Sequence, residues 1–302
     1  MHRVAVALVA AVAVLVVAAG AGIAATGDPE PPQVIEDSTH VRELPRGGVR
    51  IFPRHRVVAF AGSPGIPELG ALGVGKLEDA VRRLRHQMLE YRDGGRVLLP
   101  ALDLIATIAS SSPGDDDRYR WRRPLSIVRD HLAASREARA LLLIHIQPGR
   151  STFIEELHRF RRFLEEPDVG VALDPEWRMG PHEVPGKVIG SADASEVNEV
   201  SRYMARIVRR YHLPQKLLVV HEFTEHMIRR RERLKQREGV ALTISIDGVG
   251  SRSAKEGTYQ RLTEPDDPFF HGFKLFYEED THLMTPGQVL DLRPRPDLVV
   301  YE

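Results

Sequence analysis

Two acidic residues separated by one position are the sharpest chemical feature of this sequence. In the segment Leu173-Asp174-Pro175-Glu176-Trp177, both carboxyl groups follow a short apolar run and precede an aromatic side chain. Residues two positions apart on a strand lie on the same face, so each carboxyl group experiences the charge of the other. Such repulsion raises the pKa of one group and yields a neutral general acid beside an ionised partner. Trp177 offers a flat apolar surface, suited either to a sugar ring or to packing at a rim.

Other apolar runs also end in ionisable side chains, and alternation along a strand predicts which of them point inward. In Val240–Asp247, for example, the leucine and the isoleucines face one way and Asp247 faces the other. The rule predicts an inward set of Asp103, His145, Gln147, Asp174, Glu176, His221, Asp247 and Lys274. It favours His221 over its neighbour Glu222, but alternation often fails at strand ends, so Glu222 stays a candidate. Tyr277, which ends its own run, is a further candidate for contact with a ligand.

The elements that must position these side chains are short apolar runs alternating with longer amphipathic stretches. Runs rich in Val, Ile, Leu or aromatic residues predict buried parallel strands. The expected strands are His55–Gly62, Arg96–Ile105, Ala140–Gln147, Val169–Glu176, Lys216–Phe223, Val240–Asp247, Phe270–Tyr277 and Asp297–Tyr301. The expected helices are Lys76–Arg92, Pro124–Arg136, Ser151–Glu165, Ala192–His212, Thr224–Arg237, Gly257–Thr263 and Thr285–Leu292. Asp193 and Pro286 are typical of helix starts.

Strict alternation of strand and helix predicts right-handed crossovers and a parallel sheet, and eight strands favour closure into an α/β barrel, the (β/α)8 or TIM barrel. The links that follow strands include the longer ones, as expected when function lies at the carboxyl ends of the strands. The eighth strand has no covering helix after it in this sequence, and we expect the segment before His55 to cover that gap.

The composition restricts the classes of partner. Forty-two basic and 42 acidic residues give no net charge, so nothing favours nucleic acid as a partner. There is no cysteine, which excludes disulfides and thiolate metal sites. Gly248-Val249-Gly250 lacks the further glycines and the context of a dinucleotide site, so no cofactor is expected. The sequence does not indicate an oligomeric state.

The amino terminus differs from the rest of the chain. Arg3 precedes an uncharged run from Val4 to Ala25, which is typical of a secretory signal but is also long enough to span a membrane. We therefore expect residues 1–27 to be a signal peptide or anchor, 28–53 to be a proline-rich linker and 54–302 to be the barrel domain. An extracellular or cell-envelope location follows, with contact to a membrane only through the first segment.

The run ending at Glu176 resembles the fourth strand of chitinase-like glycoside hydrolases, which carries the pattern D-x-x-D-x-D-x-E. The last two acidic positions match at Asp174 and Glu176, while the earlier two are Val169 and Ala172 here. The resemblance implies that Glu176 protonates the leaving oxygen and that Asp174 orients the substrate. The departures leave an N-acetyl specificity without support. The whole chain is also similar to uncharacterised secreted bacterial TIM-barrel proteins with glycoside-hydrolase-like character.

The leading hypothesis is therefore an exported hydrolase that acts on, or at least binds, a glycan. Glu176 would be the general acid, Asp174 would tune it, and Asp247 or Glu222 would be the second carboxylate. The residues expected to bind the substrate are Asp103, His145, Gln147, Trp177, His221, Lys274 and Tyr277. Two alternatives remain open: a metal-dependent hydrolase of an ester, amide or phosphodiester that uses the same residues, and a non-catalytic envelope protein that binds a glycan or another protein. No H-x-H or H-E-x-x-H motif is present to favour the metal.

Overall fold

A computed structural model describes residues 42–264 and 266–302 of the chain. Its main sheet contains eight parallel strands that close on themselves, because β1 pairs with both β2 and β11. The barrel strands are β1 (His55–Gly62), β2 (Val97–Ala109), β4 (Leu141–Ile146), β5 (Val169–Leu173), β7 (Lys216–Glu222), β9 (Val240–Ile246), β10 (Phe270–Leu275) and β11 (Leu298–Tyr301). The predicted α/β barrel of the TIM type is confirmed.

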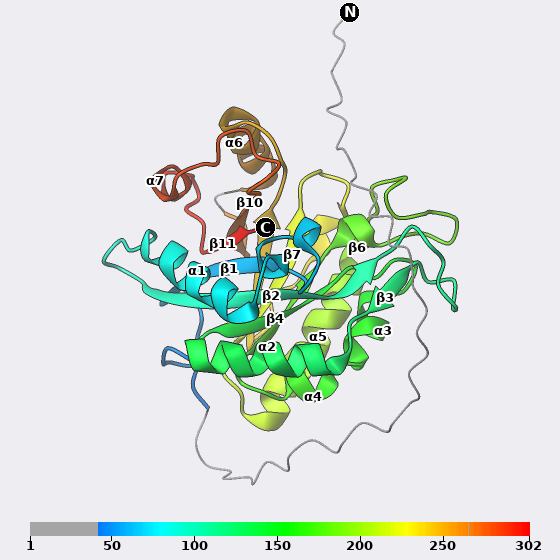
Figure 1. Ribbon diagram of the computed structural model, residues 1–302, viewed down its shortest axis with the longest axis horizontal. Coiled ribbons are helices and arrows are strands. Elements are labelled where there is room, and N and C mark those ends of the chain that lie inside the picture. The colour runs from blue at the N-terminus through cyan, green and yellow to red at the C-terminus, as the bar shows by residue number, and fades with distance from the viewer. Residues whose placement is uncertain (1–41, 265) are drawn as a thin grey trace, which may run out of the picture.

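Helices surround the strands in Figure 1, and they occupy most of the predicted positions. They are α1 (Leu77–Leu89), α2 (Leu125–Ala138), α3 (Phe153–His158), α4 (Arg161–Leu164), α5 (Ala194–Tyr211), α6 (Arg252–Leu262) and α7 (Pro286–Leu290), with 3-10 turns η1 (Pro67–Leu69), η2 (Ala71–Gly73), η3 (Pro175–Trp177) and η4 (Arg231–Arg233). The Asp193 side chain caps α5 by accepting the backbone N–H of Ser195 at 2.9 Å. Pro286 is the first residue of α7, as expected.

Three secondary-structure predictions were wrong. Thr224–Arg237 forms no helix; it contains only the short strand β8 (Ile228–Arg229), paired with β6 (Ala192–Asp193), and the turn η4. The segment has too few apolar residues for a helical face, and its buried groups are instead fixed by contacts such as the ion pair of Arg231 with Glu222. The single helix expected over Ser151–Glu165 is divided into α3 and α4. Strand β2 is longer than predicted, because the antiparallel strand β3 (Arg120–Arg122) pairs with its end.

Alternation along the strands divides the apolar residues into two cores. Outward side chains such as Ile144 and Leu242 pack under the helices, with Val128 and Val197 among their neighbours. Inward residues fill the amino-terminal end of the barrel together with residues from the preceding segment: Leu44, Ile51, Phe52, Val57, Ala59, Ala61, Leu99, Ala101, Leu141, Leu143, Ala172, Leu217, Val219, Ala241, Leu298 and Val300. We call this second cluster the barrel floor.

Residues 42–54 therefore plug the floor. We had expected the segment before His55 to cover the gap beside the eighth strand, and these residues do not do so. Leu44, Ile51 and Phe52 are at most 3% exposed, so part of the predicted linker belongs to the folded domain. No helix follows β11 within the described residues. None of the described helices is both long enough and apolar enough to cross a membrane. The predicted signal or anchor at residues 1–27 lies outside the described residues.

Candidate functional site

Charged and polar side chains replace the apolar filling at the carboxyl-terminal end of the barrel interior. Most come from the last inward position of a strand or from the residue just after it, whereas Asp103 lies in the middle of β2, which continues to Ala109. The set is Asp103 (β2), His145 (β4), Gln147 (after β4), Asp174 (after β5), His221 (β7), Asp247 (after β9), Lys274 (β10) and Glu302 (after β11). We call this set, with Glu176 above it, the mouth cluster. All but Glu302 and Glu176 are less than 9% exposed.

His145 lies between two carboxylates. Its Nδ1 is 3.2 Å from Asp103 Oδ1, and its Nε2 is 3.3 Å from Asp174 Oδ2. Complete burial is the largest influence and opposes a charge on the ring, but the two carboxylates together outweigh it and raise the pKa of His145 to about 10. The ring is therefore an imidazolium at neutral pH, and it compensates negative charge at the centre of the cluster.

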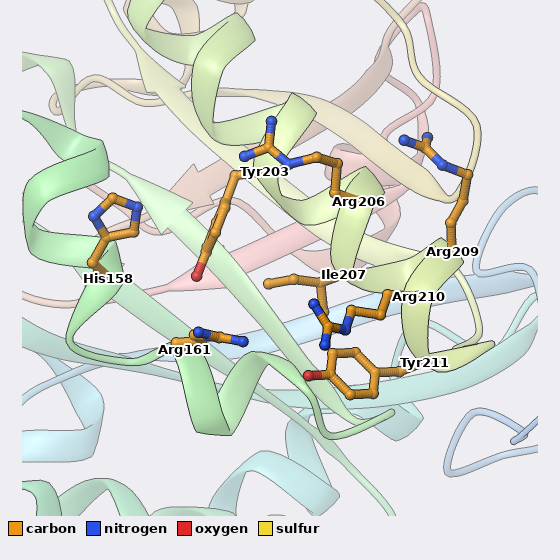
Figure 2. A pocket seen from close by; sticks show the side chains of 8 residues that line it. All are labelled: His158, Arg161, Tyr203, Arg206, Ile207, Arg209, Arg210 and Tyr211. Atoms are coloured by element: carbon orange, nitrogen blue, oxygen red, sulfur yellow. The ribbon is translucent and has the colours of Figure 1, made fainter.

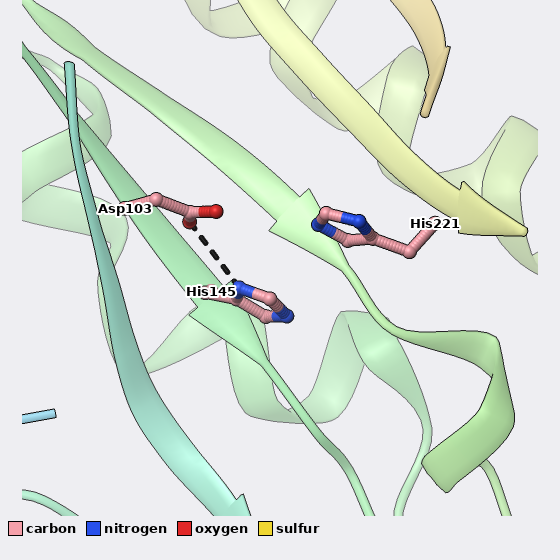
Figure 3. A group of neighbouring side chains, drawn as sticks. All are labelled: Asp103, His145 and His221. Atoms are coloured by element: carbon pink, nitrogen blue, oxygen red, sulfur yellow. Dashed lines mark ion pairs between the residues drawn. The ribbon is translucent and has the colours of Figure 1, made fainter. Parts of the chain in front are cut away.

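His221 stacks against His145, with ring centroids 4.9 Å apart and planes within 8° of parallel (Figure 3). Its Nδ1 lies 2.8 Å from Asp247 Oδ2, and the Ser245 hydroxyl donates to the other Asp247 oxygen at 3.0 Å. Burial would raise the pKa of Asp247, but His221 and Lys274 outweigh that effect and lower it to about 2. Asp247 is therefore a firmly held carboxylate.

Lys274 joins the last two barrel strands to the cluster. Its Nζ lies 2.7 Å from Glu302 Oε2 and 3.4 Å from Asp247 Oδ2. Burial opposes its charge, but the carboxylates of Glu302 and Asp247 outweigh burial and raise the pKa of Lys274 well above its usual value. Glu302 was not predicted, although it continues the inward alternation of Leu298 and Val300, because the predicted strand ended at Tyr301.

The pair Asp174 and Glu176 does not share a strand face as expected, because β5 ends at Leu173 and Glu176 lies in the turn η3. The pKa values of the two groups are nevertheless shifted in opposite directions. Asp174 is buried, yet hydrogen bonding and charge from His145 outweigh the burial and lower its pKa, and Gln147 donates to the same oxygen at 3.3 Å. Burial is the larger cause and repulsion from Asp174 the second, and together they raise the pKa of Glu176 well above its usual value. The Glu176 carboxyl group is only partly exposed and has no hydrogen bond or ion pair among the described residues. Burial and the neighbouring charge therefore favour the protonated form of Glu176.

Three predicted residues do not join the mouth cluster. Glu222 is fully buried on the outer face of β7, where Arg231 Nε contacts it at 3.2 Å. Burial still raises the pKa of Glu222 to about 7. Tyr277 stacks on Tyr301 outside the barrel wall and lines a cavity of about 970 Å³ between α1 and the end of β11, which Glu302 of the mouth cluster also lines. Trp177 is half-buried at the rim, with no ring contact to another aromatic side chain among residues 42–264 and 266–302.

Asp103, His145 and His221 are the described residues that come nearest to a metal-ligand set, with one ligand atom from each within 4.8 Å of the others. An imidazole binds an ion through a lone pair that lies in the ring plane. Two stacked, nearly parallel rings cannot both place one ion in their planes. His145 is also protonated, with Asp103 and Asp174 within 3.3 Å of its two ring nitrogens. Metal binding therefore requires one ring to turn and His145 to release a proton, so the observed arrangement fits an ion-pair network better than a metal centre.

The fold and this cluster define an α/β barrel of the TIM type with a charged, largely buried site at the carboxyl ends of its strands. No known family model and no curated protein matches the sequence. The chemistry of the site therefore has to be argued from its own geometry.

Proposed function

We propose that the protein hydrolyses a glycosidic bond, with Glu176 as the general acid. The observation that carries this proposal is the partly exposed carboxyl group of Glu176, which has no partner among the described residues and whose pKa is raised, beside Asp174, whose pKa is lowered. A group kept protonated near neutral pH can protonate a poor leaving group such as an alkoxide, which glycoside hydrolysis requires. The resemblance to chitinase-like hydrolases at Asp174 and Glu176 supports the same assignment.

Asp247 supplies the second carboxylate of the proposed mechanism. Glu222, the other candidate, points away from the mouth and is paired with Arg231. As Glu176 gives its proton to the leaving oxygen, the bond between that oxygen and the anomeric carbon breaks. Asp247 either attacks this carbon or takes a proton from the attacking water, and the anomeric configuration of the first product distinguishes the two.

The remaining polar groups would bind and orient the sugar. Gln147 and His221 belong to the mouth cluster, and Lys274 Nζ lies 3.4 Å from Asp247 Oδ2. Trp177 would pack against a sugar face at the rim. Export to the cell envelope, predicted from residues 1–27, would place the protein among extracellular glycans, and it stays a prediction because those residues are not described.

The test compares two strand-end glutamates whose pKa is raised. The full chain, Glu176→Gln and the matched control Glu222→Gln are incubated with cell-wall and storage polysaccharides, and released oligosaccharides are measured by mass spectrometry. General-acid catalysis contributes roughly 10²–10⁴-fold, so we expect Glu176→Gln to lose that factor and Glu222→Gln to retain turnover. An aryl glycoside whose leaving group needs no proton should restore much of the rate to Glu176→Gln.

Several results would reject the assignment. Equal turnover by Glu176→Gln would remove Glu176 from the mechanism, and equal losses in both variants would point to a general structural effect. Stoichiometric zinc or another divalent ion in the purified protein, with activity lost on chelation, would favour metal-dependent hydrolysis. Glycan binding that survives Glu176→Gln, with no product from the wild type, would favour a binding protein.

A further inference from the structure

A second polar concavity lies in the outer helical layer, away from the mouth cluster. It is a cavity of about 740 Å³ between α5 and the segment that carries α3 and α4. In Figure 2, the side chains of Arg161, Tyr203 and Tyr211 point into this space, with Arg206 and Arg210 on the α5 side. His158 and Arg209 complete its polar lining. We call this concavity the arginine cleft.

The charges in the arginine cleft are not balanced. Within the part of the chain that the structure describes, Arg161 is the one arginine of the four that pairs with a carboxylate, that of Glu165 at 3.3 Å. The Tyr211 hydroxyl donates to the same Glu165 oxygen at 2.8 Å, so this oxygen already accepts from two groups. Arg206 and Arg210 have no ion pair or hydrogen bond among the described residues, and each lies over a tyrosine ring, with the guanidinium carbon 5.7 and 5.6 Å from the centroid. In a chain with equal numbers of acidic and basic residues, this is a local positive excess.

An unused hydrogen-bond donor faces the same space. The Tyr203 hydroxyl oxygen is buried and has no partner among the described residues, although its ring is held edge-on by His158 at 5.2 Å. Burial raises the pKa of Tyr203, so the hydroxyl keeps its proton and can donate it to a bound acceptor. A buried hydroxyl without a partner costs free energy, which a bound anion would recover.

The dipole of α5 explains only part of this arrangement. Arg209 and Arg210 lie in the last turn of the helix, where positive charge is favourable in any protein. Tyr203 and Arg206 lie earlier on the same helix, and Arg161 belongs to α4. The dipole does not account for their convergence on one cavity.

We propose that the arginine cleft binds the phosphoryl group of a soluble phosphorylated molecule. Planar guanidinium groups match the geometry of phosphate oxygens, and phosphate accepts several hydrogen bonds at once. The cavity has the volume of a small-molecule pocket and exceeds that of one phosphate, so the rest of the ligand would lie against the tyrosine rings. This site is independent of the hydrolysis proposed for the mouth cluster.

The test measures binding of pyrophosphate to the full chain by titration calorimetry. The double variant Arg206→Gln/Arg210→Gln removes two unpaired guanidinium groups from the cleft. Arg202→Gln is the matched control, because Arg202 is exposed on the same helix, has no ion pair among the described residues and does not line the cavity. We expect the double variant to bind pyrophosphate at least roughly tenfold more weakly, about the effect of one charge-assisted hydrogen bond, and Arg202→Gln to bind as the wild type.

Tyr203→Phe separates a built site from diffuse positive charge, because it removes the hydroxyl without changing any charge. We expect it to weaken pyrophosphate binding by several fold. Vesicles of phosphatidylglycerol in phosphatidylcholine test the other source of phosphoryl groups. The proposal would be overturned if the wild type bound no pyrophosphate or bound only to vesicles. It would also be overturned if Arg202→Gln weakened pyrophosphate binding as much as the double variant.

Discussion

The two ends of the barrel interior are built from the same eight strands and are filled in opposite ways. At the floor, Leu44, Ile51 and Phe52 meet small and branched apolar side chains from the strands. At the mouth, the inward positions carry Asp103, His145 and other ionisable groups, most of which are also buried. Apolar burial stabilises the floor without any need for partners, whereas each charge at the mouth depends on an opposite charge beside it. The floor is therefore stabilised by apolar packing, whereas the mouth is held together by balanced charges.

Two buried lysines show the same difference in detail. Lys216, at the amino-terminal end of β7, donates only to the carbonyl oxygens of Glu166 and Val169, at 2.7 and 2.8 Å. Burial outweighs the more distant acids and lowers the pKa of Lys216 to about 7. Lys274, at the mouth, contacts two carboxylates and has a raised pKa. Backbone carbonyl groups satisfy the hydrogen bonds of the buried Lys216 ammonium group, but they stabilise its charge less than the two carboxylates stabilise that of Lys274.

The largest expected effect on stability is at the floor. Phe52→Ala removes a ring that is 2% exposed and lies 4.7 Å from the Phe270 ring, so it leaves a cavity. We expect a loss of about 3–5 kcal/mol in the free energy of unfolding, measured by urea denaturation. Any hydrolytic activity should persist in the folded fraction. A loss of activity without a loss of stability would contradict the separation of the two ends.

Removal of the lysine at the mouth should have the next largest effect. Lys274→Met leaves Asp247 and Glu302 without their shared cation, and we expect a cost of about 3 kcal/mol at pH 7. This is the low end for a broken buried pair, because the Glu302 side chain is 22% exposed and can turn to solvent. Lys216→Met is the matched comparison and should cost less, since it also removes a buried charge. A larger cost for Lys216→Met would reverse our interpretation of the two lysines.

The two ends should respond to pH with opposite signs. His145 has a folded-state pKa of about 10, above its usual 6.5, so its contribution to stability is complete below pH 6.5 and is lost as the pH rises toward 10. Lys216 has a folded-state pKa of about 7, below its usual 10.5, so its burial cost disappears as the pH rises between those values.

The free energy of unfolding, measured by urea titration from pH 7 to 10, tests these signs. The difference between wild type and His145→Gln should fall with pH, and the difference between wild type and Lys216→Met should rise. Each slope is at most about 1.4 kcal/mol per pH unit. Slopes of the same sign would contradict the direction of the pKa shift for either His145 or Lys216.

The smallest expected effect concerns the hydroxyl group beside Asp247. Ser245→Ala removes a hydrogen bond to a buried carboxylate, which we expect to cost about 1–2 kcal/mol at pH 7. Thr243→Val on the same strand removes a 3.4 Å hydrogen bond to a neutral carbonyl oxygen and should cost less. Thermal unfolding of the two variants gives the comparison, and equal costs would mean that the charge of Asp247 adds nothing.

Much of the barrel was predictable from the sequence because alternation and burial are local rules. The eight strands and the inward set from Asp103 to Lys274 follow from them, as does the preference for His221 over Glu222. The Thr224–Arg237 segment was not predictable in this way, because distant contacts such as that of Arg231 with Asp267 determine its path. The positions of Glu302 and Tyr277 depend on where a strand ends, which local patterns determine poorly. Ion-pair partners in the mouth cluster depend on the closed sheet and required the three-dimensional structure.

Closure of the sheet has a consequence for the order of events in folding. Val57 of β1 pairs with Leu298 of β11, so the seam joins strands from distant parts of the sequence. Loop-closure entropy makes such pairings slow to form. Glu302 follows β11, the strand that closes this seam, and pairs with Lys274 of the neighbouring strand β10. During refolding, recovery of a functional mouth should therefore lag behind the recovery of helix and strand content, because the last charges of the site arrive with the last strand.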